Sequence, residues 1–293
     1  MNPLAFLLPL GAAFLYTFAT VFSKRAIEEG AGIMRMAFIS NMATFLFPAL
    51  ALAALHPPAP AAASLLPALV CGALFFAGQV FIFCGIRVGD VTIQVPLLGI
   101  KVVFVAICAV FITGTPPSWR LFAASAITMF AVFLMGISNV RFTRQTLLTI
   151  VFVVLANLCF AFSDCVIQVA MSDAGPLWFV SAMYFSTFLC SFGLMPFFKA
   201  PLKSIPKSAW KWALPGGVVM AVQGFLLVAA IGGFKIATEA NIIYASRGLW
   251  SIVIIWFAGK SLGIHEKNIG KSMMLRRLAG ASLLMLAVVT AIA

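Results

Sequence analysis

Residues 146–171 read TLLTIVFVVLANLCFAFSDCVIQVAM, a run of 26 residues whose one charged side chain is Asp164. A bilayer core about 30 Å thick is crossed by a helix of roughly 20 apolar residues, so this run is long enough to span a membrane. Its polar residues Asn157, Asp164 and Gln168, with Ala161 between the first two, follow one another at helical spacing and share one helix face. Lipid cannot satisfy polar groups, so we expect this face to meet a cavity or another helix.

The composition of the whole chain agrees with this segment. Of 293 residues, 63% are hydrophobic and only 9% are charged, whereas soluble domains carry about 25% charged residues. The net charge of +12 does not indicate nucleic-acid binding, because no basic stripe or aromatic–basic platform accompanies it. The sequence therefore predicts an integral membrane protein.

Ten apolar runs follow one another along the chain, with Pro- and Gly-containing turns between them at residues 56–60, 114–117, 175–176 and 201–206. The connections are short, so nothing outside the membrane forms its own core. We predict an all-α integral membrane protein with ten transmembrane helices in a single membrane domain, residues 1–293. The expected spans are 3–23, 33–55, 65–86, 92–112, 119–139, 146–171, 176–198, 212–234, 238–258 and 273–293.

The basic residues are distributed unevenly between the two sides of these spans. Fifteen Lys and Arg residues lie in the loops after odd-numbered spans, and only Arg120 and Lys235 lie in the loops after even-numbered ones. Short cytoplasmic loops are enriched in Lys and Arg. We therefore predict cytoplasmic odd loops and both termini outside, in a multi-pass protein of a bacterial inner membrane.

The chain also repeats itself weakly. Residues 120–125 (RLFAAS) at the fifth span resemble residues 277–282 (RLAGAS) at the tenth. Residues 85–90 (GIRVGD) precede the fourth span as residues 233–238 (GFKIAT) precede the ninth. Five spans per half is an odd number, so the halves must lie in opposite orientations, a recurrent transporter design with the substrate site between them. The predicted five-helix inverted repeats are residues 1–145 and 146–293.

This pattern resembles the drug/metabolite transporter superfamily, in particular its ten-helix EamA-type branch. The resemblance rests on the two five-span halves, on basic and small residues before the fourth and ninth spans, and on a short Gly/Pro loop before the fifth. Glu266 stands where the family often has an acidic residue before the last span, while residues 113–115 (TGT) depart from this in the first half. The resemblance implies a basket of helices around a central cavity, alternating access, and export or exchange of amino acids, phosphorylated metabolites or nucleotide-sugars. Family members are often drawn with cytoplasmic termini, opposite to the orientation that the charge count predicts.

Two cations lie deep inside predicted spans. Lys101 and Arg247 are each the tenth residue of a span, the fourth and the ninth, about 13–14 Å from its start. A charge at the centre of a membrane helix costs at least about 2.5–3.5 kcal/mol of insertion free energy, so we expect each cation to have a stabilising partner. The partner could be a substrate anion bound between the two halves, or it could be another side chain that pairs with the cation permanently. Asp164 is the only deep acid, and it could neutralise a cation, bind an amino group of the substrate, or carry a proton.

Neutral polar residues on the same helices are further candidates for substrate contact, although ordinary helix–helix hydrogen bonding explains each of them equally well. Gln94 lies seven residues before Lys101 and shares its helix face. Asn241 and Tyr244 precede Arg247 at steps of three residues. The remaining candidates are Asn157 and Gln168 beside Asp164, and Tyr16 and Thr20 on the first span.

These residues together favour a secondary transporter of a small anionic or zwitterionic metabolite, held by Lys101 and Arg247. The first alternative is an exporter of amino acids or amines in which Asp164 takes the amino group. An alternative of another class is a membrane enzyme or flippase-like protein that acts on a lipid phosphate. No catalytic motif or group of metal ligands is present, so we expect no enzyme, metal or cofactor. The expected partners are the small-molecule substrate and the lipid bilayer, and not nucleic acid.

Overall fold

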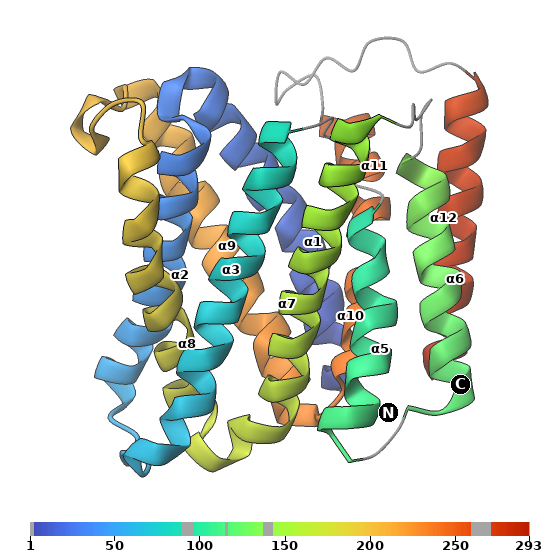
Figure 1. Ribbon diagram of the computed structural model, residues 1–293, viewed down its shortest axis with the longest axis horizontal. Coiled ribbons are helices and arrows are strands. Elements are labelled where there is room, and N and C mark those ends of the chain that lie inside the picture. Colours follow the sequence, from blue (N-terminus) through green and yellow to red (C-terminus); the bar gives the residue numbers. More distant parts are fainter. Residues whose placement is uncertain (1–2, 89–96, 115–116, 137–142, 259–270, 293) are drawn as a thin grey trace.

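The computed structural model describes residues 3–88, 97–114, 117–136, 143–258 and 271–292 of the chain. Within these ranges every regular element is a helix, as the sequence predicted. Six helical segments of the described residues are long and apolar enough to cross a membrane by themselves, and shorter apolar helices accompany them. Figure 1 shows the helices side by side, with the chain passing back and forth between two ends of the bundle.

The helices in the described ranges account for ten spans. Eight are continuous, the fourth is α5 with the 3₁₀ turn Leu98–Ile100 before it, and the ninth is divided into α10 and α11. The bounds are α1 Pro3–Ala26, α2 Ile33–Leu55, α3 Leu66–Val88, α5 Lys101–Ile112, α6 Trp119–Gly136, α7 Arg144–Ala174, α8 Pro176–Ser191, α9 Lys207–Phe234, α10 Ala237–Tyr244, α11 Arg247–Ala258 and α12 Lys271–Ile292.

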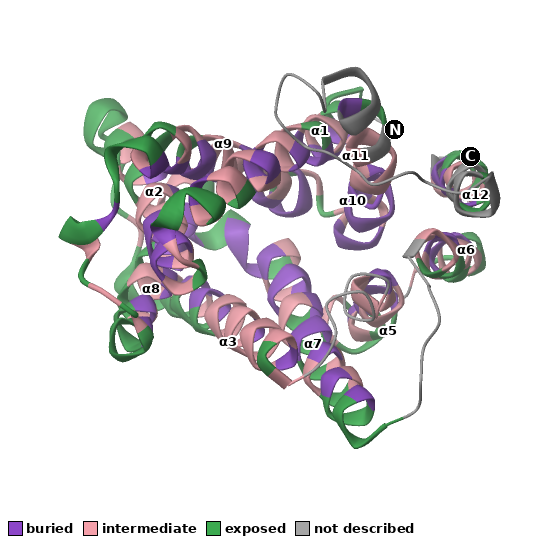
Figure 2. Ribbon diagram, turned by 90° about the horizontal axis from the view of Figure 1, so that it is seen from above, coloured by how far each residue is buried: buried purple, intermediate pink, exposed green. Residues whose placement is uncertain are grey.

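The packing of the helices is nearly unchanged when the first five spans are exchanged with the last five. Helix α1 packs on α9, and its counterpart α7 packs on α3. In the same way α2 packs on α9 and α8 packs on α3, while α2 contacts its own counterpart α8 and α6 contacts its counterpart α12. Figure 2 shows the α6–α12 pair at one end of the bundle and α2 with α8 at the other.

Matching local structure at the starts of α2 and α8 also indicates that these two helices correspond to each other in the two halves. Gly32 (φ 75°, ψ 145°) precedes α2, and Gly175 (φ 76°, ψ 144°) precedes α8. A positive φ favours glycine at both positions. Three residues further on, Arg35 donates a hydrogen bond to a proline carbonyl of the α8–α9 connection (3.1 Å), and Trp178 donates to a proline carbonyl of the α2–α3 connection (3.3 Å). Equivalent helix starts are thus tethered to equivalent loops.

The ninth span differs from the single continuous helix that the sequence predicted. Helix α10 ends at Tyr244 and α11 begins at Arg247, with Ala245 and Ser246 in a turn between them. The amides of Ser246 and Gly248 donate to carbonyls three residues back, as in a 3₁₀ turn. Arg247 therefore begins a new helix. Because a 3₁₀ turn aligns residues three apart, its guanidinium stays beside Tyr244, 4.6 Å from the ring centroid.

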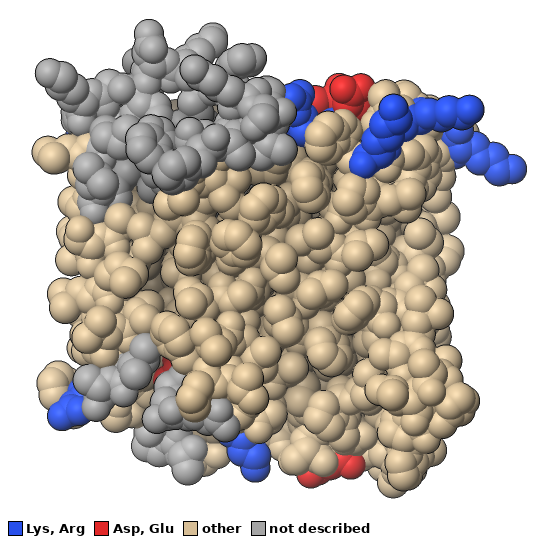
Figure 3. Space-filling view, turned by 180° about the vertical axis from the view of Figure 1, so that it is seen from behind, with Lys and Arg blue, Asp and Glu red and all other residues tan. Residues whose placement is uncertain are grey.

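Both termini lie at the same end of the bundle (Figure 1), as an even number of spans requires. Figure 3 shows Lys, Arg, Asp and Glu side chains at the two edges of the face in view and a broad band without them between the edges. Such a band is what a membrane-embedded surface presents. Which edge faces the cytoplasm remains a prediction from the loop charges.

A reporter fused after Ala293 tests that orientation. We expect a reading outside the cytoplasm, because fifteen basic residues lie in the predicted loops opposite the termini and two lie in the predicted loops on the same side. A second reporter in the α8–α9 connection, for example after Lys203, should read as cytoplasmic. The opposite pair of readings would show that the protein inserts with cytoplasmic termini.

A candidate substrate site at the centre of the bundle

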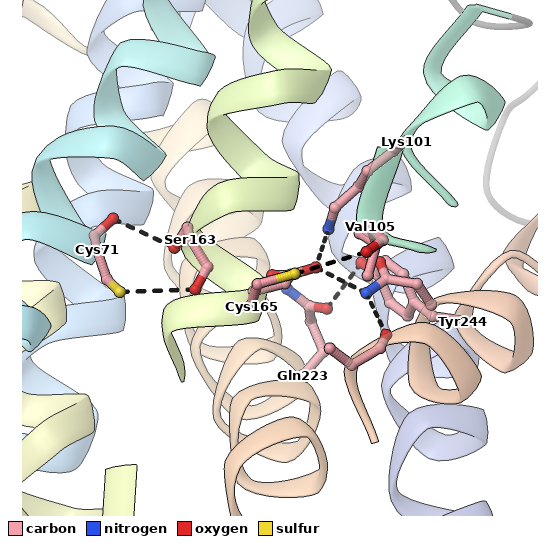
Figure 4. Close-up of polar contacts among 10 residues, drawn as sticks. Cys71, Lys101, Val105, Ser163, Cys165, Gln223 and Tyr244 are labelled. Atoms are coloured by element: carbon pink, nitrogen blue, oxygen red, sulfur yellow. Dashed lines mark hydrogen bonds and ion pairs between the residues drawn. The ribbon is translucent and has the colours of Figure 1, made fainter. Parts of the chain in front are cut away.

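The carboxylate of Asp164 on α7 joins both halves of the chain. Its Oδ2 lies 2.8 Å from the Nζ of Lys101, the first residue of α5. The same oxygen accepts a hydrogen bond of 2.7 Å from the side-chain amide of Asn241 on α10. Figure 4 shows Lys101 reaching from α5 toward the region where Gln223 and Tyr244 also point. The side chains of Lys101 and Asp164 are 16% and 11% exposed, so this ion pair is mostly withdrawn from solvent.

Two further contacts hold α7 against the interrupted spans. The Oε1 of Gln168 accepts a hydrogen bond of 2.7 Å from the backbone N–H of Ala237, one of the free amides at the start of α10. The side-chain amide of Asn157 donates to the carbonyl of Leu97, 2.9 Å away, just before the 3₁₀ turn that leads into α5. The polar face of α7 therefore satisfies the backbone and side chains of the broken spans, and it does not face lipid.

Arg247 has a different environment from Lys101. Its guanidinium carbon lies 5.0 Å from the ring centroid of Tyr16 on α1 and 4.6 Å from that of Tyr244. The two rings also contact each other, and the hydroxyl of Tyr244 donates to Oε1 of Gln223 on α9 (3.0 Å). Among the described residues, no carboxylate lies within salt-bridge distance of Arg247. Cation–π contacts of this kind contribute about 0.5–2 kcal/mol, but they leave the positive charge unneutralised.

The two cations occupy corresponding places. Lys101 begins α5 after the 3₁₀ turn Leu98–Ile100, and Arg247 begins α11 after the turn that separates it from α10. Lys101 contacts Asp164 on α7, and Arg247 contacts Tyr16 on α1, the helix that corresponds to α7. Tyr16 and Asp164 are 148 residues apart, the offset that also relates residues 85 and 233 in the sequence repeat. One half thus pairs its cation with a carboxylate, and the other holds it between aromatic rings.

Depth places both cations near the middle of the membrane. Arg247 is ten residues after Ala237, where the ninth span begins, and Lys101 is eleven residues before Ile112, where the fourth ends. At 1.5 Å per residue these separations are about 15 Å and 16 Å, half of a 30 Å core. The three charges Lys101, Arg247 and Asp164 sum to +1.

The other candidate residues from the sequence have less direct roles. The hydroxyl of Thr20 donates to the carbonyl of Thr17 on its own helix (2.8 Å), which is ordinary helix back-bonding. Gln94 lies outside the described residues. Asn157 and Gln168 are engaged with backbone groups, as described above.

Sequence reasoning missed several polar residues of this region. Gln223 lies within a long apolar run, and that isolation is the one signal that could have marked it. Asn41 of α2 and Gln79 of α3 exchange two side-chain amide hydrogen bonds of 3.0 Å each. Ser246 and Trp250, next to Arg247, carry buried polar atoms that have no hydrogen-bond partner in the described part of the chain. Of these two, the sequence had already suggested Trp250 as a continuation of the Arg247 face by one turn, and Ser246 was missed.

Comparison with known proteins identifies the class of the fold. Residues 3–137 match the model of the EamA-like transporter family. This match confirms the resemblance to the drug/metabolite transporter superfamily, a class of small-molecule membrane transporters. No curated protein matches the chain. A solved structure described only as a crystal structure of a protein has a TM-score of 0.70 and 12% sequence identity, over 96% of this chain and 96% of that one. That likeness shows that the whole chain shares a known fold.

Proposed function

We propose that this protein is a secondary transporter of a small anionic or zwitterionic metabolite, and that Arg247 binds the anionic group of the substrate. One observation carries the proposal. Arg247 lies near mid-membrane between Tyr16 and Tyr244, with no carboxylate beside it in the described ranges, whereas the corresponding Lys101 is neutralised by Asp164. An unneutralised cation at this depth is costly, and a substrate anion would offset that cost.

The exchangeable packing of residues 1–145 and 146–293 supports alternating access by two inverted halves. The ninth span is interrupted near its middle, and the described part of the fourth span begins with a 3₁₀ turn before Lys101. Asp164 contacts both spans through Lys101 and Asn241. Discontinuous helices at the boundary between repeats are where transporters of this design bind their substrates. Rocking of one half against the other would expose Arg247 first to one side and then to the other.

In this proposal Asp164 is the counter-ion of Lys101 and does not bind a substrate amine. Its Oδ2 already accepts hydrogen bonds from Lys101 at 2.8 Å and from Asn241 at 2.7 Å. A substrate ammonium would have to displace the lysine, so the contacts favour the anion reading over amine export. Lys101 can join Arg247 on the anion only in a state in which the pair with Asp164 has separated.

A ligand-stabilisation screen of the purified protein tests this function. The compounds to be tested, each at millimolar concentration, are carboxylates, phosphates, amino acids and amines. We expect the anionic compounds to raise the melting temperature and the amines to leave it unchanged. A ligand at 100 times its Kd stabilises by about 2.7 kcal/mol, which is readily detected. Stabilisation by amines but not by anions would favour the amine exporter, with Asp164 as the substrate-binding group. Compounds that stabilise should then be taken up into proteoliposomes, which separates transport from catalysis.

A further inference from the structure

Two buried hydrogen-bond donors next to Arg247 have no hydrogen-bond partner among the described residues. The hydroxyl of Ser246, a residue only 4% exposed, and the indole N–H of Trp250 form no hydrogen bond in the described part of the chain. A buried donor left unsatisfied costs about 1–3 kcal/mol, and native proteins tolerate few of them. Two within five residues, on either side of an unneutralised guanidinium, indicate a site for a hydrogen-bond acceptor.

The three donors belong to one short stretch of the ninth span. Ser246 lies in the turn that separates α10 from α11, Arg247 begins α11, and Trp250 follows three residues later on the same side of that helix. Trp250 packs edge-on against Phe14 of α1 (5.1 Å between centroids), and Arg247 lies over Tyr16 of the same helix. Arg247 and Trp250 therefore both face α1.

The charge of the centre limits the ligand. With Lys101 paired to Asp164, the described residues leave one positive charge of this centre without a carboxylate, that of Arg247. A singly charged anion brings the total to zero, whereas a doubly charged phosphate would leave an excess negative charge at mid-membrane. A carboxylate presents two oxygens with about four acceptor positions, which suits the forked guanidinium together with a hydroxyl and an indole N–H.

Apolar and aromatic side chains surround these donors. Tyr244, with Ala12 and Ala13 of α1, forms a buried cluster against which Trp250 and Leu226 pack. Within the described ranges, no further acid lies near this cluster to recognise a second polar group. A ligand bound at Arg247 would therefore place the rest of its body against an apolar wall.

We infer that the substrate is an organic monocarboxylate with an apolar body, and that its carboxylate binds the Arg247 guanidinium, the Ser246 hydroxyl and the Trp250 indole N–H. The inference rests on the proposed anion transport and narrows its substrate class. Ser246 and Trp250 become substrate-binding residues, and the hydrogen bonds that they lack in the empty protein are made by the carboxylate.

Benzoate is the probe, because it has one carboxylate and an apolar ring. Ser246→Ala and Trp250→Phe should each weaken benzoate binding by about tenfold or more, as expected for a lost hydrogen bond to a charged group. Ser246→Ala should not lower the melting temperature of the ligand-free protein, since it removes a donor that had no partner in the described ranges. Trp250→Phe also shortens a ring that packs against Phe14, so it is judged by its benzoate affinity. Ser181→Ala is the matched control, because Ser181 of α8 also has a buried hydroxyl without a partner. Trp119→Phe, at an exposed tryptophan, is the control for Trp250.

The outcomes separate this inference from the function on which it rests. If Arg247→Gln abolishes benzoate binding while Ser246→Ala and Trp250→Phe bind with wild-type affinity, the donor set is wrong and anion binding at Arg247 stands. If Arg247→Gln still binds benzoate, the proposed function itself fails. Tighter binding of phenyl phosphate at pH 8 than of benzoate, or no benzoate binding at millimolar concentration, would overturn the monocarboxylate assignment.

Discussion

Asp164→Asn should destabilise the ligand-free protein by about 3–5 kcal/mol, because removing one partner of a buried ion pair leaves the other charge unneutralised. The partner is Lys101, whose Nζ lies 2.8 Å from the carboxylate in a mostly buried setting. The asparagine keeps the shape of the side chain and can still accept from Asn241, so the loss reports the charge. Chemical denaturation or thermal unfolding of the purified protein in detergent measures it.

The control for this variant lies on the same helix. Asp173, near the end of α7, is exposed, and its contact is a hydrogen bond of 3.3 Å from its neighbour Ser172. Asp173→Asn should therefore leave stability unchanged within about 0.5 kcal/mol. The double variant Lys101→Met with Asp164→Asn should recover most of the loss, because no uncompensated charge remains. Wild-type stability of Asp164→Asn alone would show that the pair is not the counter-ion arrangement described above.

An anionic ligand should affect Asp164→Asn and wild type differently. In the variant both Lys101 and Arg247 lack a carboxylate partner, so a bound anion offsets more of the positive charge and should restore part of the lost stability. If Asp164 were instead a proton carrier, Asp164→Asn would fold normally, retain exchange and lose only pH-driven accumulation. The melting temperatures with and without anion distinguish the two roles.

The spans and the three central charges could be predicted from the sequence for a simple physical reason. Apolar runs of about 20 residues indicate membrane spans. Charged residues such as Arg247 are rare within such runs, so they are easily recognised in the sequence. Repeat spacing then predicted nearly equivalent positions for Lys101 and Arg247, and in the structure each is the first residue of an α-helix that follows a tighter turn.

The partners of these charges could not be predicted in the same way. From the sequence, Asp164 could have paired with either Lys101 or Arg247. The packing of α5 on α7 brings Lys101 to it. The break before Arg247 contains no proline. Ser246 and Gly248, on either side of Arg247, are residues that continuous membrane helices also tolerate. Without that break, the unpartnered donors of Ser246 and Trp250 could not be associated with the guanidinium.

The central claim is that Arg247 binds the substrate anion, and its largest expected effect is on affinity. Arg247→Gln removes the charge but keeps a polar side chain between Tyr16 and Tyr244. Truncating one partner of a buried charged contact costs about 2–5 kcal/mol, which corresponds to a loss of about 30-fold to several thousandfold in affinity. The ligand-free variant should be at least as stable as wild type, because the lost cation had no carboxylate partner in the described ranges.

The most direct measurement is calorimetric binding of the best stabilising anion to wild type, Arg247→Gln and the exposed-lysine control Lys203→Gln, followed by uptake into proteoliposomes. We predict that Arg247→Gln loses both binding and uptake while its melting temperature without ligand is unchanged or higher, and that Lys203→Gln behaves as wild type. Wild-type binding and uptake by Arg247→Gln, or a lower melting temperature with affinity retained, would contradict the account and assign Arg247 a purely structural role.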